Sequence, residues 1–309
     1  NEDVVIPRDR LADYSEGIER INIEQSMHNK LRALEAVDEY LDGDLPELRL
    51  VAEYESSAEN SAIVADKQRA ARAHLAAVRT RWSALLSRLD GPAAEHGDLL
   101  DADLRAKVQA GDTLLALLLR RDLRISYRRE VAQVLKEIFD GQAFAPVRAR
   151  FDEIHAAIRS GRLFVALHMH AGDGNVHTNI PVNSNDYQML QEAERVVDRV
   201  MALAQSLDGV ISGEHGIGIT KIHYLAPETV ADFAAYKRKV DPEGRFNRGK
   251  LLAGSGLAQA YTPSLRLVQQ EALLLEESEL GALNDDIRHC LRCGKCKPVC
   301  NTHIPRANL

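Results

Sequence analysis

Two glycine-framed histidine segments constrain the fold of this chain more than any other feature. Residues 168–177 read His-Met-His-Ala-Gly-Asp-Gly-Asn-Val-His, and residues 212–218 read Ser-Gly-Glu-His-Gly-Ile-Gly. A helix is unfavourable across so many glycines, because glycine loses more conformational freedom on entering a helix than any other residue. The first segment therefore predicts a tight turn that folds His170 and His177 inward.

The side chains in these two segments are of the types that bind divalent cations. His170 and His177 can supply two imidazole nitrogens, and Glu214 can complete a three-ligand set, with His215 beside it as a proton acceptor. Three protein ligands with an open position are typical of a catalytic metal rather than a structural one. The pattern favours metal-assisted chemistry on a small oxygen-bearing molecule.

Further polar residues in and after these segments are expected to have lesser roles. Asp173 and Asn175 are predicted to bond backbone groups of the turn rather than the cation. If the strand before the turn continues through His170, His168 shares its face and is a further ligand or an outer donor. Lys221 and His223 follow the second segment and could reach the substrate or flavin, but they are interpreted as solvated surface residues.

Composition excludes several classes of protein. The formal net charge is −7, whereas a nucleic-acid-binding surface needs clustered positive charge. The longest apolar run, residues 114–119, is far too short to span a bilayer. All four cysteines lie between positions 290 and 300, which indicates metal or cluster ligation in a reducing compartment rather than a disulfide framework.

Changes in residue composition along the sequence divide the chain into four parts. Residues 28–161 consist of long Ala/Arg/Leu/Glu segments and are predicted to be a helical insertion, in which apolar stripes form a core. Residues 1–27 and 162–256 are predicted to form the domain that carries the histidine segments. A helical linker is expected over 257–284, and residues 285–309 begin a cysteine-bearing domain.

Hydrophobic periodicity predicts the main elements. We expect short strands at residues 3–7, 163–167 and 178–182, a strand-like entry at 209–212, and helices at 8–21, 61–89, 144–159, about 190–203 and 227–240, with helical patterns also over 99–140. Alternating strands and helices indicate an α+β fold: a mixed or antiparallel sheet with flanking helices and a long helical insertion.

The two histidine segments resemble a known family. His-x-Gly-Asp-Gly-Asn-x-His followed by Gly-Glu-His-Gly-x-Gly is similar to the C-terminal, substrate-facing domain of FAD-linked oxidases, the D-lactate dehydrogenase, glycolate oxidase and D-2-hydroxyglutarate dehydrogenase group. Residues 241–252 resemble the closing Asp-Pro…Asn-Pro-Gly-Lys segment of that domain, with Arg248 in place of the usual proline. The resemblance is strong over 162–253 and weak over 1–24.

The resemblance implies roles for individual residues. It assigns His170, His177 and Glu214 to a divalent metal, zinc or manganese, and His215 to the general base. It also implies that Asn179 contacts the substrate and that Asn247 lies on the flavin side. In this family the FAD-binding domain precedes the strand expected at residues 3–7, so the chain resembles an incomplete part of a larger flavoprotein.

The cysteine segment has the spacing of half a bacterial ferredoxin motif. Two, two and three residues separate Cys290, Cys293, Cys296 and Cys300, which predicts a [4Fe–4S] cluster. Asn301 stands where proline usually follows. The alternative is a zinc knuckle in which His289 or His303 joins the cysteines.

Together these patterns predict part of an FAD-dependent D-2-hydroxy-acid dehydrogenase that passes electrons from flavin to iron–sulfur clusters and then to a quinone or electron-transfer protein. We expect it in the cytoplasm or peripheral at the inner face of the membrane, with no transmembrane segment and no nucleic-acid partner. Two alternatives remain: a non-catalytic metal-binding and electron-relay module that docks a separate flavoprotein, and a metal-dependent hydrolase with the same three ligands.

Overall fold

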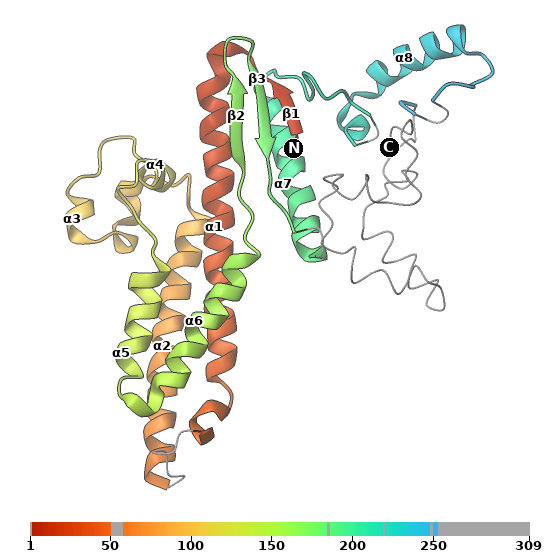
Figure 1. Cartoon of the computed structure of the whole chain (residues 1–309). Coiled ribbons are helices and arrows are strands. Elements are labelled where there is room, and N and C mark those ends of the chain that lie inside the picture. Colours follow the sequence, from red (N-terminus) through yellow and green to blue (C-terminus); the bar gives the residue numbers. More distant parts are fainter. Residues whose placement is uncertain (1, 51–57, 184–185, 219, 248–249, 253–309) are drawn as a thin grey trace, which may run out of the picture. The chain divides into compact units, whose positions relative to one another are not determined.

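The computed structural model describes residues 2–50, 58–183, 186–218, 220–247 and 250–252 (Figure 1). The chain divides into two compact units, one of residues 1–182 and 188–216 and the other of residues 183–187 and 217–309. The predicted linker and cysteine segment lie outside the described residues. No helix in the described ranges has the length and apolar character needed to cross a lipid bilayer.

The first unit contains most of the regular structure. In chain order its elements are β1 Glu2–Val5, a 3-10 turn Arg8–Arg10, α1 Leu11–Leu41, a 3-10 turn Pro46–Leu50, α2 Ala58–Ser87, a 3-10 segment Ala93–Leu99, α3 Ala102–Arg105, α4 Leu114–Leu119, a π-helical turn Arg128–Ala132, α5 Gln133–Ile138, a 3-10 turn Gln142–Phe144, α6 Ala145–Ser160, β2 Ala166–His170, β3 Asn175–Asn179 and α7 Tyr187–Ser206. The second unit contains a 3-10 turn Ile222–Tyr224 and α8 Pro227–Val240.

The sheet of the first unit is small and antiparallel. Its strand order is β1-β3-β2, with β3 paired to both neighbours. Val4, Val176 and Thr178 are fully buried, and Tyr14 of α1 lies next to Thr178. One face of the sheet is therefore part of the core, which leaves the other face for polar side chains. The predicted α+β fold with an antiparallel sheet and flanking helices is confirmed.

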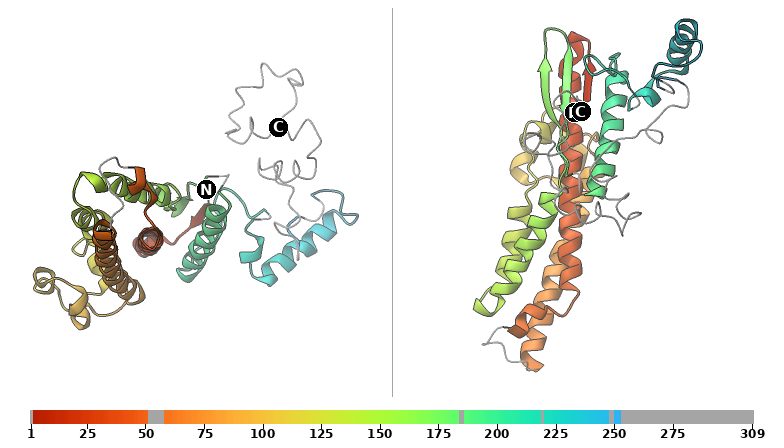
Figure 2. Two further views of the ribbon diagram at one scale, coloured as in Figure 1. Left: turned by 90° about the horizontal axis from the view of Figure 1, so that it is seen from below. Right: turned by 45° about the vertical axis from the view of Figure 1, so that its right-hand side comes forward.

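Helix α1 belongs to both halves of this unit. At one end Gly17 meets α7, where an added Cβ would lie 2.6 Å from Leu203 Cδ2. Further along, Leu34 contributes to a cluster with Trp82, Phe139 and other apolar residues of the insertion. α1 lies beside α2 and α6 (Figures 1 and 2). The predicted boundary between residues 27 and 28 thus falls inside a continuous helix.

The expected elements differ from the observed ones mainly in their limits. The predicted strands at 163–167 and 178–182 are each displaced by three residues from β2 and β3, and the turn between them is correspondingly shorter. Residues 163–165 have no regular secondary structure, and Asn22 bonds the Val165 carbonyl (3.0 Å) and amide (2.8 Å). The helical pattern over 99–140 is broken into short pieces, two of which begin at the side-chain caps Asp101 and Thr113.

Candidate metal centre

The β2–β3 hairpin presents its histidines on the open face of the sheet. His168 pairs with His177, and His170 pairs with Asn175. Residues directly opposite one another in an antiparallel pair point to the same side, and so do residues two apart along a strand. The register therefore gathers these side chains on one face, and Asp3, opposite His177 on β1, joins them.

A glycine makes the turn between the two strands possible. Gly174 has φ +75°, and a Cβ there would lie 2.2 Å from the carbonyl oxygen of Ile6. The Gly174 carbonyl accepts a hydrogen bond from the Ile6 amide at 2.8 Å. Any larger residue would break this contact, so the close approach explains the glycine at this position.

The second histidine segment is held against the end of β1. Val5 and Val210 exchange two backbone hydrogen bonds, at 2.9 and 2.8 Å, which place residues 211–216 over the open face. Gly213 permits the approach, since a Cβ there would lie 2.7 Å from Asn175 Oδ1 and 2.8 Å from Val5 Cγ2. This loop carries Glu214 and His215 to the hairpin.

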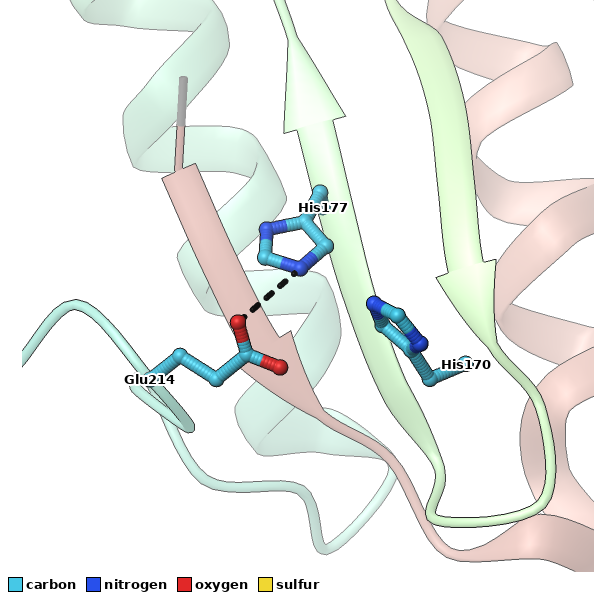
Figure 3. A group of neighbouring side chains, drawn as sticks. All are labelled: His170, His177 and Glu214. Carbon is cyan, nitrogen blue, oxygen red and sulfur yellow. Dashed lines mark ion pairs between the residues drawn. The ribbon is translucent and has the colours of Figure 1, made fainter.

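His170, His177 and Glu214 converge at this place (Figure 3). Their candidate ligand atoms all lie within 4.8 Å of one another. His177 Nε2 and Glu214 Oε2 are 3.5 Å apart. Two ligands on a tetrahedral ion with bonds of about 2.1 Å are separated by about 3.4 Å, so this spacing fits a shared cation.

The surroundings of the three side chains also fit a cation. His177 Nδ1 and Asn175 Oδ1 are buried and have no hydrogen-bond partner among the described residues. Buried polar atoms without partners are rare in folded proteins. Nδ1 is the His177 nitrogen that faces away from Glu214, and it is where a metal-bound histidine usually takes an outer hydrogen-bond partner such as water. The donor set of two imidazoles and one carboxylate matches catalytic zinc sites, which keep a further position open. The residues present therefore fit a divalent cation.

Asn175 links two of the candidate ligands. Its Nδ2 donates to Glu214 Oε1 at 2.6 Å and lies 3.5 Å from His177 Nε2. The side chain is 5% exposed, whereas that of Glu214 is 57% exposed. Asn175 therefore holds an otherwise mobile carboxylate in position, as outer partners of metal ligands do. Its predicted bonding to backbone groups is absent from the described contacts.

Asp3 is a residue of the candidate site that the sequence interpretation missed. Its carboxylate is fully buried and accepts hydrogen bonds from the amides of Gly213 (2.7 Å), Glu214 and His215 (3.1 Å). Asp3 Oδ1 also lies 3.6 Å from His215 Nδ1. One carboxylate thus fixes the backbone of the loop and faces the predicted base. The available signal was an acidic residue inside a short apolar strand, which is costly unless the carboxylate is bonded.

The remaining predicted residues of this unit lie near the three candidate ligands. The His177 and His215 ring centroids are 5.2 Å apart. His168 stands 5.6 Å from His170 and 6.2 Å from His177 between ring centroids, but it is outside the group whose ligand atoms converge. Asn179 ends β3 on the same face as His177, two residues further along.

Other predicted residues belong to the second unit or to undescribed segments. Asn247 has φ +43°, and its carbonyl accepts a hydrogen bond from Lys237 Nζ at 2.8 Å. Lys221 is only 2% exposed, so its interpretation as a surface residue is wrong. His223 lies 3.8 Å from the Tyr224 ring, measured between centroids. Cys290, Cys293, Cys296 and Cys300 lie outside the described residues.

Comparison with protein families identifies the segment that carries this site. Residues 141–251 match the family described as FAD linked oxidases, C-terminal domain. The three candidate ligands, Asn175 and His215 fall inside this range, and Asp3 lies outside it. The match confirms the resemblance drawn from the two histidine segments, and it does not extend to the cysteine segment.

Individual relatives match about a quarter of the chain. Similar proteins are the mitochondrial D-lactate dehydrogenase [cytochrome] of Arabidopsis thaliana (38% identity over 87 residues), the glycolate oxidase subunit GlcD of Escherichia coli K12 (39% over 92) and a D-2-hydroxyglutarate dehydrogenase of Stutzerimonas stutzeri (37% over 90). The matches cover 27%, 28% and 27% of this chain but only 15%, 18% and 19% of those proteins. No solved structure matches the chain.

Proposed function

We propose that this chain is part of an FAD-dependent D-2-hydroxy-acid dehydrogenase, in which the hairpin and the loop of residues 211–216 bind a divalent cation and the substrate. The observation that carries the proposal is the convergence of His170, His177 and Glu214 within 4.8 Å, with His215 beside them. The similarity of residues 141–251 to the C-terminal domain of FAD linked oxidases supports the same conclusion.

His215 is proposed as the base that accepts the proton of the substrate hydroxyl. Its Nδ1 faces the Asp3 carboxylate, which favours the tautomer that carries the proton on Nδ1. Nε2 is then the nitrogen with a free lone pair. The backbone bonds from residues 213–215 to Asp3 keep the loop, and with it the imidazole, in place. The side chain remains 37% exposed, which leaves it accessible to a small acid.

The cofactors supply the remaining chemistry. When bound, the zinc or manganese ion would hold the carboxylate and α-hydroxyl of the substrate and lower the pKa of that hydroxyl, and the flavin would accept the two electrons from C2. Asn175 keeps Glu214 turned toward His177 in this scheme. Asn179, on the same face, is proposed to contact the substrate.

Substrate class and electron transfer are further parts of the proposal. The names of the relatives indicate D-lactate, glycolate or D-2-hydroxyglutarate as substrates to test. The spacing of the four cysteines supports a [4Fe–4S] cluster that receives electrons from the flavin and passes them to a quinone or an electron-transfer protein. Asn247 is proposed to lie on the flavin side.

The test compares two neighbouring histidines of β2. Full-length protein carrying His170→Ala is analysed for bound metal, for flavin absorbance and for dye reduction with D-lactate, L-lactate, glycolate and D-2-hydroxyglutarate. We expect loss of the metal and of turnover while the flavin is retained. His168→Ala is the matched control, because His168 shares the strand and the face but lies outside the converging group.

Four results would contradict the proposal. Unchanged metal content and turnover in His170→Ala would remove the metal assignment. A normal rate in His215→Asn would remove the base. Hydrolysis of an added ester substrate such as p-nitrophenyl acetate, without dye reduction by any of the hydroxy acids, would favour a metal-dependent hydrolase. Metal binding without any turnover in the flavin-loaded wild type would favour a non-catalytic module.

A further inference from the structure

The helical insertion contains a second pocket that the proposed function does not use. Its volume is about 410 Å³, and its walls come from α1, α6, Tyr127 and the residues before β2. This volume lies in the range of small-molecule sites. The residues that give the pocket its character are Lys30, Tyr127, His155, Arg159, Arg162 and Phe164.

The lining of this pocket is cationic. Lys30, Arg159 and Arg162 all contribute to it, and its lining among the described residues includes no aspartate or glutamate. Within the described part of the chain, none of these three cationic side chains forms an ion pair with a carboxylate. Other arginines of the insertion do form such pairs, as Arg120 does with Asp112. The pocket therefore offers positive charge that the described protein does not neutralise.

The surroundings of Lys30 show most clearly the effect of an excess of positive charge in the pocket. Burial lowers its pKa from the ordinary value, and Arg162 lowers it further, while Glu130 opposes the shift. The Glu130 carboxylate is already engaged by Arg81 Nη1 at 2.5 Å and Trp82 Nε1 at 3.0 Å. Lys30 Nζ donates instead to the neutral Ser26 hydroxyl at 2.9 Å. A partly buried ammonium without a carboxylate is unfavourable unless a ligand supplies the missing charge.

The walls of the pocket are fixed by contacts of their own. Asn22 ties α1 to Val165 through two hydrogen bonds, and the rings of Tyr127 and His155 stack with centroids 4.1 Å apart. Leu163 and Val165 are buried, whereas Phe164 between them is 45% exposed. The cationic groups thus lie on a preformed frame beside an apolar surface that a ligand could cover.

We propose that this pocket binds a small organic molecule through an oxyanion, a carboxylate or phosphate group held by Lys30, Arg159 and Arg162. Guanidinium groups suit these planar or tetrahedral anions because their paired N–H donors match the oxygens. The less polar remainder of the molecule would lie against Phe164.

The experiment measures binding to the whole chain without reference to activity. Succinate and inorganic pyrophosphate serve as carboxylate and phosphate probes, titrated by calorimetry at constant ionic strength because surface attraction is screened by salt. We expect saturable binding of at least one probe. The probe that binds more tightly shows whether the pocket prefers a carboxylate or a phosphate group.

Variants connect that binding to the pocket. Replacing both arginines, Arg159→Gln with Arg162→Gln, is expected to raise Kd by about tenfold or more, the loss expected for charge-assisted hydrogen bonds. Lys30→Met is expected to weaken binding while leaving the melting temperature unchanged or higher, because it removes a partly buried charge that lacks a carboxylate partner. A structural role for Lys30 would lower the melting temperature instead.

The matched control removes the same charge elsewhere. Arg69→Gln with Arg88→Gln changes two exposed arginines outside the pocket and is expected to leave Kd unchanged. Equal weakening in the control and in Arg159→Gln with Arg162→Gln would overturn the proposal, since binding would then follow net charge alone. Absence of saturable binding by either probe would overturn it as well.

Discussion

Asp3 and His215 are 212 positions apart in the chain, yet Asp3 Oδ1 lies 3.6 Å from His215 Nδ1. The same carboxylate accepts hydrogen bonds from three consecutive backbone amides of the loop that carries His215. The first strand thereby positions both a candidate metal ligand and the candidate base. Four predictions follow from this arrangement and from the packing around it.

Asp3→Ala is expected to lower the free energy of unfolding by about 3–5 kcal/mol, because three backbone donors lose a buried charged acceptor. Asp3→Asn retains the shape and part of the bonding, and we expect a smaller loss of about 1–3 kcal/mol. Urea unfolding of the chain measures both values. Asp9→Ala is the control, since Asp9 is exposed and makes no side-chain contact among the described interactions. Equal stability of Asp3→Ala and Asp9→Ala would contradict the anchoring role.

Asn175→Ala is expected to weaken zinc binding by about 10–100-fold, the loss typical of outer partners of metal ligands. The reason is the 2.6 Å hydrogen bond that turns Glu214 toward His177. Glu214→Gln, which removes the ligand charge itself, should weaken binding further. Competition with a chromogenic chelator gives both affinities. If Asn175→Ala binds zinc as tightly as the wild type, Glu214 does not depend on this contact.

Two glycines near the candidate site should respond differently to alanine. Gly213→Ala would bring a methyl group within 2.7 Å of Asn175 Oδ1, so we expect a loss of about 1–3 kcal/mol in unfolding free energy and weaker zinc binding. Gly172→Ala meets nothing within 4 Å and should be close to neutral. Thermal unfolding with and without zinc distinguishes the two. A neutral Gly213→Ala would mean that the loop stands further from the hairpin.

Acid should remove one stabilising pair of the insertion. Hydrogen bonds from Arg120 lower the pKa of Asp112 from 3.8 to about 2. A carboxyl whose pKa is lowered by folding stabilises the fold above its unfolded pKa, and this contribution disappears as the pH falls through the folded value.

The difference in unfolding free energy between wild type and Asp112→Asn should therefore be constant above about pH 5 and vanish toward about pH 2. Denaturant unfolding at a series of pH values measures it. Asp98→Asn, at an exposed position with no side-chain interaction among the described residues, should show no such dependence. A difference that persists at the lowest pH would mean that Asp112 stabilises through its shape and not its charge.

Much of the fold could be predicted from hydrophobic periodicity. The elements whose predicted bounds were wrong show where tertiary contacts determine the structure. The apolar spacing of residues 61–89 predicted α2 within a few residues, since a long amphipathic helix is specified locally. The strand predicted at 163–167 is displaced because strand pairing, and not apolar character, determines where β2 begins. Leu163 and Val165 are buried, as the hydrophobic pattern requires, but they lie in a segment without strand pairing. Asn22 holds that segment in place.

The candidate site was predictable where ligand types cluster in sequence, and unpredictable where a partner comes from far away. His170 and His177 are seven positions apart, Glu214 follows 37 positions after His177, and all three are framed by glycine, so their types alone indicated a cation. Asp3 lies in a strand of ordinary sequence, and only the pairing of β1 with β3 brings it under the loop. The role of Asn175 likewise depends on the approach of Glu214, which local sequence does not encode.

The two hydrogen bonds between Asn22 and Val165 hold together positions that are 143 residues apart. The helical insertion thus leaves the sheet-bearing half and returns to it at almost the same point. A segment with adjacent ends can be shortened, lengthened or exchanged by evolution or by protein engineers without disturbing the hairpin. The insertion can in this sense change independently of the sheet. It can acquire a binding function of its own while the face of the sheet that carries the histidines is unchanged.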